Sequence, residues 1–434
     1  MQDFFNSQSH RPLTEKDYQI SRILFLIEGC TGMAIFTLTS GAFLAGFFNY
    51  LEIGDWFNGI LAGFPVLFGI VLLFGPFFLQ RLEQRKHFII ITGILFRTLL
   101  ALMFVIPLLT KGWFYNSALT AFVYGLAAIL NPFYTLAIGN WLISLTPDRL
   151  RGQYLGLKDA LTYIFLTVVN IFMGWTLDIY KAQGKQEQGF MICGITVMVL
   201  MMINAIALWM AKEPKVSVNH KRNNPPEVLV STFRDNGFRK VILFYILWNF
   251  GLQFAAPFVN VYLVSGLKLN YTYIMMMGLI TNALRVLTNP IWGRFADWHS
   301  WESTTKISLL LLAGSHGLLF LINRETVHYL YPIFAILSGI AWGGAGIATF
   351  SLQFNYTPEA ARTVYLAANT AISGVAGFSA TVAGSFIIGY MGLITVKPFG
   401  LNISPMQIVF ITSGVLLAIS ALFIHLHLQK SSKS

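Results

Sequence analysis

Residues 146–161 read TPDRLRGQYLGLKDAL, and residues 357–372 read TPEAARTVYLAANTAI. The two stretches are 211 positions apart, which is close to half of the 434-residue chain. Six of their sixteen aligned positions are identical, and Asp148 aligns with Glu359. A repeat at this distance indicates that the chain consists of two related halves.

A second, weaker pair of segments supports the duplication. The segment GPFFLQRLE ends at Glu83, and the segment NPIWGRFAD ends at Asp297. Aligning Pro76 with Pro290 places the two acids opposite each other. Each half therefore carries a proline, an acid seven residues later and, farther on, a Thr-Pro-acid loop with an arginine.

The composition identifies the environment of the chain. Hydrophobic residues make up 56% and charged residues 11%, against roughly 45–50% and 25% in soluble domains. So few charges cannot cover the surface of a soluble protein. The chain is therefore predicted to be a polytopic membrane protein, and disorder and a disulfide scaffold are excluded. The net charge of +11 belongs to loops at the membrane surface rather than to a nucleic-acid interface.

Twelve apolar runs have the length that a membrane-spanning helix needs, about 20 residues. They are continuous rather than alternating, which favours an all-α fold over a barrel. The predicted spans are 21–47, 57–79, 88–109, 117–142, 158–177, 190–211, 241–264, 272–293, 306–323, 330–353, 364–390 and 405–427.

The distribution of basic residues predicts the orientation. Loops on the side of the termini hold 21 of the 29 Lys and Arg residues, and the opposite loops hold six. This bias predicts a multi-pass protein of the cytoplasmic membrane with both termini in the cytoplasm. No cleavable signal peptide is visible in the polar N-terminal stretch.

A polar, basic loop with two adjacent prolines divides the chain near its middle. The loop is typical of a linker between two bundles. Two duplicated bundles can rock about a central site, which is alternating access. The predicted organisation is a cytoplasmic segment 1–20, a six-helix bundle 21–211, a linker 212–240, a pseudo-symmetric six-helix bundle 241–427 and a tail 428–434.

Three segments resemble motifs of the major facilitator superfamily. GRFAD at 293–297 resembles the start of that family's signature loop, and PDRLRG at 147–152 resembles its loop between spans 4 and 5. WNFG at 248–251 is similar to span 7 of poorly characterised bacterial members. The resemblance implies a twelve-helix transporter fold for the whole chain and leaves the substrate open.

The resemblance also implies a set of gating residues in the loops. Asp297 corresponds to the acid that latches one state of the transporter, and Glu83 is its weaker counterpart in the first half. Arg151 and Arg362 are suitable partners because arginine–carboxylate pairs can form and break as the bundles move. The alternative is that the acid only ends a helix and that the arginines only set the topology.

Three charged residues lie clearly inside the predicted spans, away from the span ends, where charge is costly. Glu28, Arg97 and Arg285 are each about 12–14 Å from the terminus-side end of their spans, at 1.5 Å per residue. Desolvation favours the neutral acid, and a nearby arginine favours the carboxylate. Glu28 could therefore carry a coupled proton, or it could form a static ion pair. Arg97 fits a structural role, and Arg285 could also meet an anionic group of a substrate.

The resemblance places spans 1, 4, 7 and 10 around the substrate cavity. A small polar solute needs a few hydrogen-bonding groups and an aromatic wall. The alternative for these side chains is adhesion between helices. The candidates are Thr31, Asn131, Tyr134, Asn249, Gln253 and Trp342.

These observations favour a secondary active transporter of a small organic solute, coupled to protons through Glu28. The expected partners are the solute, protons and membrane lipids, and the expected state is a monomer. No nucleotide, metal or catalytic motif is recognised, so we expect no cofactor, no metal, no catalytic residue and no nucleic-acid partner. The alternatives are an uncoupled facilitator, a drug exporter of the same fold or, remotely, a membrane-embedded enzyme or receptor.

Overall fold

The computed structural model describes residues 13–73, 85–109, 113–214, 236–357, 362–392 and 403–428. Helices make up nearly all of these residues, and no strand occurs among them. Twelve helices of this part are long and apolar enough to cross a membrane. The predicted all-α class with twelve spans is therefore confirmed.

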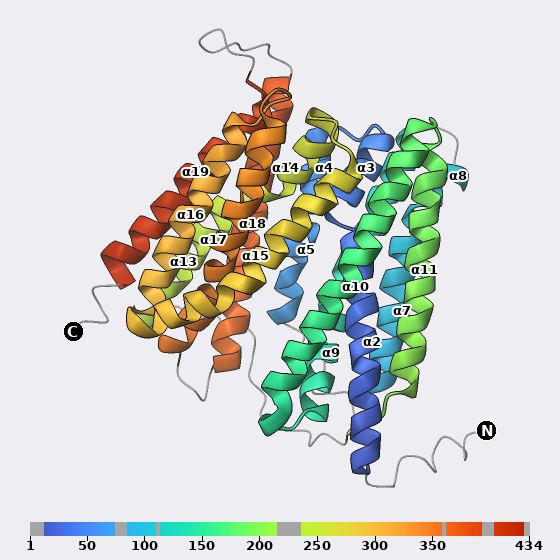
Figure 1. Ribbon diagram of the computed structural model, residues 1–434, viewed down its shortest axis with the longest axis vertical. Helices are drawn as coiled ribbons and strands as arrows, with labels where there is room; N and C mark the ends of the chain where they lie inside the picture. The colour runs from blue at the N-terminus through green and yellow to red at the C-terminus, as the bar shows by residue number, and fades with distance from the viewer. Residues whose placement is uncertain are drawn as a thin grey trace.

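The first six spans form one group of helices (Figure 1). In chain order they are α2 (Glu15–Leu38) continued by α3 (Gly41–Tyr50); α4 (Asp55–Ala62), α5 (Phe64–Leu67) and η2 (Phe68–Leu73); α7 (Arg85–Met103), followed by the short α8 (Ile106–Leu109); α9 (Trp113–Leu145); α10 (Asp148–Ala182); and α11 (Gln186–Met210). We call this group the first bundle.

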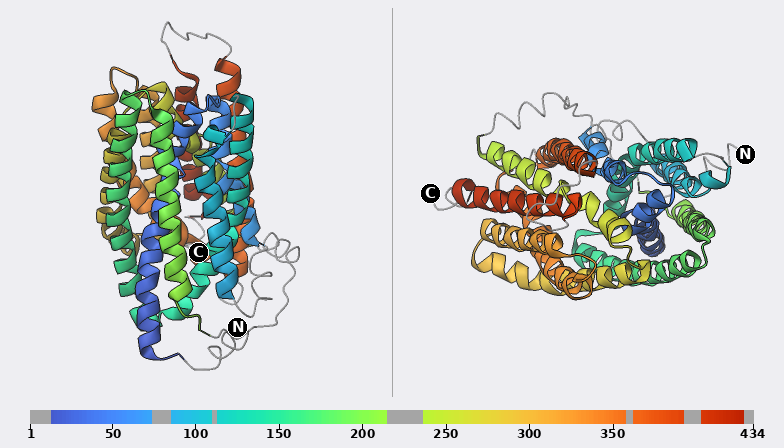
Figure 2. Two further views of the ribbon diagram at one scale, coloured as in Figure 1. Left: turned by 90° about the vertical axis from the view of Figure 1, so that its right-hand side faces the viewer. Right: turned by 90° about the horizontal axis from the view of Figure 1, so that it is seen from above.

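The last six spans form the second bundle. They are α13 (Asn236–Gln253) with α14 (Ala256–Val261) and η3 (Tyr262–Gly266); α15 (Tyr271–Trp298); α16 (Trp301–Leu321); α17 (Val327–Asn355); α18 (Arg362–Gly392); and α19 (Pro405–Phe423) with η6 (Ile424–Leu428). Seen from above, the two bundles lie side by side (Figure 2).

Local sequence explains where the first helix starts and breaks. The Thr14 side chain accepts from the backbone of Asp17, whose carboxylate accepts in return from Thr14, which is a capping box. The helix ends at Leu38, and Gly41 has a φ of +55°. Glycine adopts this left-handed backbone without a steric penalty. The break separates α2 from α3 and bends the first span.

The helix α10 begins earlier than its predicted span. Prediction placed the start at residue 158, but the helix begins at Asp148, directly after Pro147 at the N-cap. Its 35 residues correspond to about 52 Å, well beyond the ~30 Å of a bilayer core. Lys158, the first residue of the predicted span, consequently lies about 15 Å inside a helix.

The two bundles meet at one end of the molecule. Helix α2 begins and η6 ends toward the lower side of Figure 1, and the bundles diverge in that direction. Contacts of α5 and η2 with α18 lie nearer the middle of the interface, where Val66 is next to Gly374. At the end opposite the termini, α3, α4 and α10 of the first bundle contact α14, η3, α15 and α18 of the second. We call the end where these contacts lie the closed end and the opposite end the termini side.

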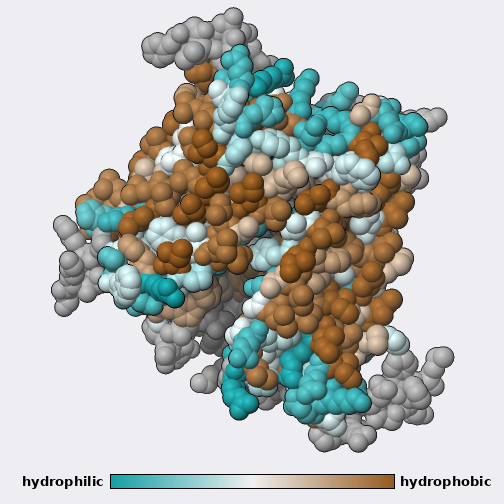
Figure 3. Space-filling model, viewed as in Figure 1, coloured by the Kyte–Doolittle hydropathy of each residue, from teal (hydrophilic) through white to brown (hydrophobic). Residues whose placement is uncertain are grey.

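The surface agrees with a position in a membrane. Hydrophobic residues cover the middle of the face in Figure 3, and hydrophilic residues gather toward its two ends. Many large apolar side chains of the molecule are exposed, among them Leu287, Ile291 and Phe386. An exposed apolar band of this kind is expected to contact the lipid tails of a bilayer.

Candidate functional site: a buried ion cluster and a cavity between the bundles

A carboxylate lies at the centre of the first bundle. Glu28 of α2 is buried, and its Oε1 accepts a hydrogen bond of 3.0 Å from the Tyr134 hydroxyl of α9. The Arg97 guanidinium of α7 is 3.9 Å from the same oxygen. The Lys158 ammonium of α10 is 3.8 Å from Oε2. Four helices thus converge on a single carboxylate, which settles that Glu28 meets Arg97.

Arg97 is fixed by more than its charge. Its Nη1 donates a hydrogen bond of 2.6 Å to the side chain of Asn204 on α11. The guanidinium also lies 4.4 Å from the centre of the Tyr134 ring, within range of a cation–π contact. Asn204 in turn donates to the Glu28 carbonyl and to the Thr31 hydroxyl. The network ties α2, α7, α9 and α11 into one unit.

Glycine on α2 makes room for the two cations. A side chain at Gly29 would lie 2.6 Å from the Lys158 ammonium, and one at Gly32 would lie 3.1 Å from Arg97 Nη2. A Cβ at either position would crowd the cation beside it, so the two glycines favour the close approach of both cations to Glu28. The Lys158 side chain stays 17% exposed, whereas Arg97 is 5% exposed. Lysine is the member of the cluster that solvent can reach best.

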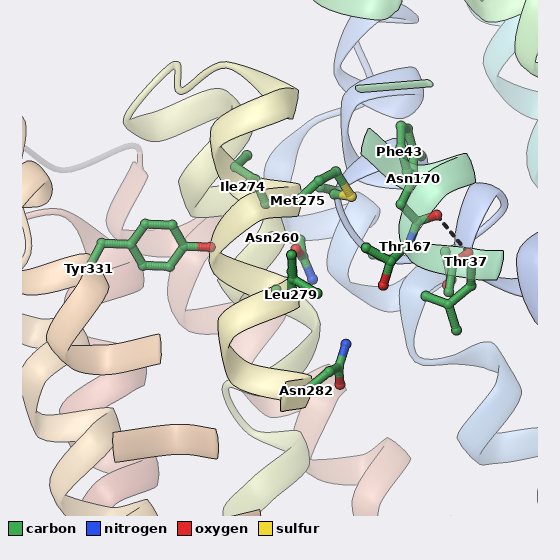
Figure 4. A pocket seen from close by; sticks show the side chains of 15 residues that line it. Thr37, Phe43, Thr167, Asn170, Asn260, Ile274, Met275, Leu279, Asn282 and Tyr331 are labelled. Atoms are coloured by element: carbon green, nitrogen blue, oxygen red, sulfur yellow. Dashed lines mark hydrogen bonds between the residues drawn. The ribbon is translucent and has the colours of Figure 1, made fainter. Parts of the chain in front are cut away.

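A cavity of about 200 Å³ lies between the bundles (Figure 4). The first bundle contributes hydroxyl and amide side chains from α2 and α10, and Thr37 donates to Asn170 at 2.9 Å. The second bundle contributes two amides, Asn260 and Asn282, and the Tyr331 side chain. Such a polar lining supplies hydrogen bonds for a small solute. None of these cavity residues was predicted from the sequence.

The closed end is held by a carboxylate that caps a helix of the other bundle. Asp178 of α10 accepts hydrogen bonds from the backbone amides of Tyr271 and Thr272, at 2.7 and 2.8 Å, and from the Thr272 hydroxyl at 2.7 Å. The N-cap residue of α15, Asn270, supplies no side-chain cap. Asp178 thus satisfies the exposed amides of α15 and faces the positive end of its dipole.

Close packing and a second polar contact complete the closed end. Ser265 donates a hydrogen bond of 2.9 Å to Asp55 across the two bundles. Gly59 of α4 lies against the Phe258 ring, where no side chain would fit. Because Phe258 is fully buried, its ring cannot move aside into solvent.

Another carboxylate caps a helix at the other end of the first bundle. Glu213 accepts from the backbone amides of Arg85 and Lys86, at 3.3 and 3.0 Å, where α7 begins. Burial raises the pKa of the Glu213 carboxyl, and the two amide hydrogen bonds oppose that rise. A carboxylate distant in the sequence therefore caps a helix start both inside one bundle and between the bundles.

The predicted cavity residues fall into two groups. Thr31 and Tyr134 are buried in the first bundle as parts of the Glu28 cluster. The others are half-buried and make local contacts. Asn131 accepts from Thr135, Asn249 donates to the Tyr245 carbonyl, Gln253 lies against Gly377, and Trp342 contacts the Trp248 ring edge-to-face at 6.0 Å.

The predicted gating residues are not seen in pairs. Asp297 is exposed in the last turn of α15, and no partner is recorded for it within the described ranges. Arg151 lies near the start of α10, where it makes interactions of its own. Glu83 and the side chain of Arg362 lie outside the described part.

Of the three predicted interior charges, Arg285 stands apart from the others. It is half-buried on α15, in the second bundle, whereas Glu28 and Arg97 meet in the first. The sequence signal that could have found the remaining members of the cluster was weak. Lys158 was the first residue of its predicted span and was not singled out as an interior charge, and Asn204 is an ordinary amide within an apolar helix.

Comparisons with known proteins agree with this architecture. The family model described as Major Facilitator Superfamily matches residues 23–381. No curated protein matches.

Solved transporter structures share the fold. The nucleoside transporter NupG superposes with a TM-score of 0.66 at 14% identity, covering 95% of this chain and 99% of its own. A D-xylose-proton symporter gives 0.67 at 14% identity, covering 94% and 96%. A bacterial homologue of the human lysosomal transporter Spinster, in an inward-facing and unoccupied conformation, gives 0.64 at 16%, covering 95% and 97%.

Sequence identities this low establish the shared fold and nothing about the substrate. The family match, by contrast, covers most of the chain, and twelve spans in two bundles accompany it. The chain therefore belongs to the major facilitator superfamily, and its family and fold support a multi-pass solute transporter.

Proposed function

We propose that this protein is a secondary active transporter that moves a small organic solute by alternating access and is coupled to protons through Glu28. The observation that supports it most is the polar cavity between two bundles that meet at the closed end. Rocking the bundles would break the Asp178 and Ser265 contacts and bring the termini side together. A single chain encloses the cavity, so a monomer suffices.

The orientation follows from the basic loops. If both termini face the cytoplasm, as the excess of Lys and Arg on that side favours, the structure is inward-facing. Asp297 would then find its basic partners only in the outward-facing state, when the termini side closes.

Lys158 is the group that could link Glu28 to transport. Arg97, Tyr134 and Lys158 all belong to the same bundle as Glu28, so rigid rocking alone leaves their contacts intact. However, α10 also packs against α15 of the second bundle. As the termini side closes, α15 approaches the part of α10 that carries Lys158, and a shift of α10 toward α15 would move Lys158 away from Glu28. Glu28 would then keep one neighbouring cation instead of two, and this change of partners is the step that would link the carboxylate to transport.

A proton-flux measurement tests this coupling. Purified protein is reconstituted into proteoliposomes that contain a pH-sensitive dye, and solutes are screened for those that move protons with them. We expect Glu28→Gln to retain exchange of the solute between the two sides but to lose solute-driven proton movement. Glu325→Gln, which neutralises an exposed carboxylate in the loop before α17, is the matched control and should behave as the unmodified protein.

Accumulation of solute by Glu28→Gln under an imposed pH gradient would refute the coupling role. The uncoupled facilitator is the second candidate, because every recorded partner of Glu28 lies in one bundle. Exchange that does not respond to pH in the unmodified protein would establish it.

A further inference from the structure

Arg285 carries a charge that nothing in the described part of the chain neutralises. It is half-buried in α15, and no hydrogen bond or ion pair of its guanidinium is recorded within the described ranges. Its Nη2 lies over Gly346 of α17, where an added Cβ would be 3.4 Å away. A guanidinium at this depth is costly unless it meets an anion or lines a water-filled cavity.

The helical phase shows which way Arg285 faces. Gly278 and Asn282 of α15 line the cavity between the bundles, and Arg285 is about 60° around the helix from Asn282, at 100° per residue. Leu287, which is 68% exposed on the lipid side, is about 160° from Arg285. Arg285 therefore lies on the cavity-facing side of α15, about 4.5 Å beyond Asn282 in the direction of the termini side, with its guanidinium beside Gly346 of α17.

The carboxylates of the described second bundle are too far away to serve Arg285. Asp297 stands in the last turn of α15, Glu302 in the first turn of α16 and Glu325 in the loop before α17. Glu302 accepts from Tyr356 instead. In the first bundle, Glu28 is already engaged by Arg97 and Lys158.

We propose that Arg285 is the anion-binding subsite of the transport cavity, so that the solute is a small organic acid. This inference rests on the proposed transport function. The acid group, a carboxylate or a phosphate, would form paired hydrogen bonds with the guanidinium fork. The amides of Asn260 and Asn282 would bind the polar body of the solute. Binding an anion at Arg285 removes the cost of its unpaired charge, and this selects acids over neutral analogues.

Asp159 of α10 is the rival partner for Arg285. Its carboxylate is exposed, and no partner is recorded for it within the described ranges. It is eleven residues from the cavity residue Asn170, so it lies about 16 Å farther toward the termini side. Arg285 is only about 4.5 Å beyond Asn282 in that direction. The two charges are therefore at different levels in this structure, although closing the termini side would bring α10 nearer to α15.

An equilibrium binding experiment tests the subsite. Thermal unfolding of purified full-length protein in detergent is followed with lactate, nicotinate, gluconate and glycerol 3-phosphate, each beside its neutral partner lactamide, nicotinamide, gluconamide or glycerol. We expect at least one acid to raise Tm by a few degrees at saturation while its partner does not. The phosphate compound against the three carboxylates shows which acid group the site takes.

The variants decide whether Arg285 is responsible. Arg285→Gln should abolish the shift caused by the acid, and Arg285→Lys should keep part of it, since the charge remains but the fork is lost. Asp159→Asn is the matched control and should keep the full shift. The Tm of each variant without added acid shows that it is folded.

Three results would overturn the inference. The first is that no acid protects the unmodified protein better than its neutral partner. The second is equal protection of Arg285→Gln. The third concerns the double variant Arg285→Gln with Asp159→Asn. If both single variants lose the shift and the double variant recovers it, Arg285 forms an ion pair with Asp159 and is not the anion subsite. The measurement uses no gradient, so it is independent of whether Glu28 carries protons.

Discussion

Removing the Asp178 carboxylate should open the closed end of the molecule. The carboxylate accepts three hydrogen bonds from α15, at 2.7, 2.8 and 2.7 Å. A hydrogen bond to a charged group contributes about 1.5–3 kcal/mol, but water can satisfy the freed amides once the end has opened. We therefore expect Asp178→Ala to shift the equilibrium by about 2–4 kcal/mol, less than the sum of three such bonds. At 1.4 kcal/mol per tenfold change, the ratio of open to closed molecules rises about 30-fold to 700-fold.

Spin-label distances report this shift directly. Gln183, after α10, and Glu325, before α17, are exposed on different bundles at this end. Both can be changed to labelled cysteines once the two native cysteines, Cys30 and Cys193, have been replaced by alanine. Asp178→Ala should add a longer distance to the distribution. Asp178→Asn, which keeps an acceptor without the charge, should give an intermediate result.

Glu187→Gln is the matched control, because it neutralises another carboxylate at the same end, in the first turn of α11. Its distance distribution should equal that of the unmodified protein. If Asp178→Ala gives the same distribution as well, the cap of α15 does not stabilise the closed end and the reasoning fails.

Two further substitutions probe the packing of the structure. Arg97→Met leaves Glu28 buried with fewer partners and should lower the free energy of unfolding by about 3–5 kcal/mol. Arg324→Met, on an exposed loop, is the control and should lower it little. Equal losses of stability in thermal unfolding would show that Arg97 does not stabilise the Glu28 cluster. Gly59→Val places atoms where the Phe258 ring lies, so in the spin-label assay it should add longer distances at the closed end. Gly156→Val is the control, because a Cβ there meets nothing within 4 Å, and it should leave the distances unchanged. A distribution unchanged by Gly59→Val would show that the Phe258 ring can move aside.

Much of the fold could be predicted because it depends on local features of the sequence. Hydrophobic run length fixes the number of spans, and the pairing of residues 146–161 with 357–372 reveals the duplication. The start of α10 was predicted ten residues late because charged and polar residues at the beginning of the helix lower its mean hydropathy. The part of a helix that extends beyond the membrane keeps its backbone hydrogen bonds but need not be apolar, so hydropathy does not reveal it.

The site was harder to predict, since it depends on how the helices are rotated. The depth of Glu28 and Arg97 could be counted along the chain, but their contact required the azimuth of α2 and α7. Asn204 and Lys158 carried no signal of their own. The Asp178 cap binds main-chain amides, so no complementary charge in the sequence marks its partner.

This last feature has a genetic consequence. An ion pair between two side chains can be restored by exchanging the charges, so a harmful mutation in one partner has suppressors in the other. The main-chain amides of Tyr271 and Thr272 offer no such remedy, because every residue except proline presents the same N–H. Loss of Asp178 should therefore have no reciprocal suppressor in the first turn of α15, and revertants should arise at position 178 itself or at distant positions that disfavour the open form.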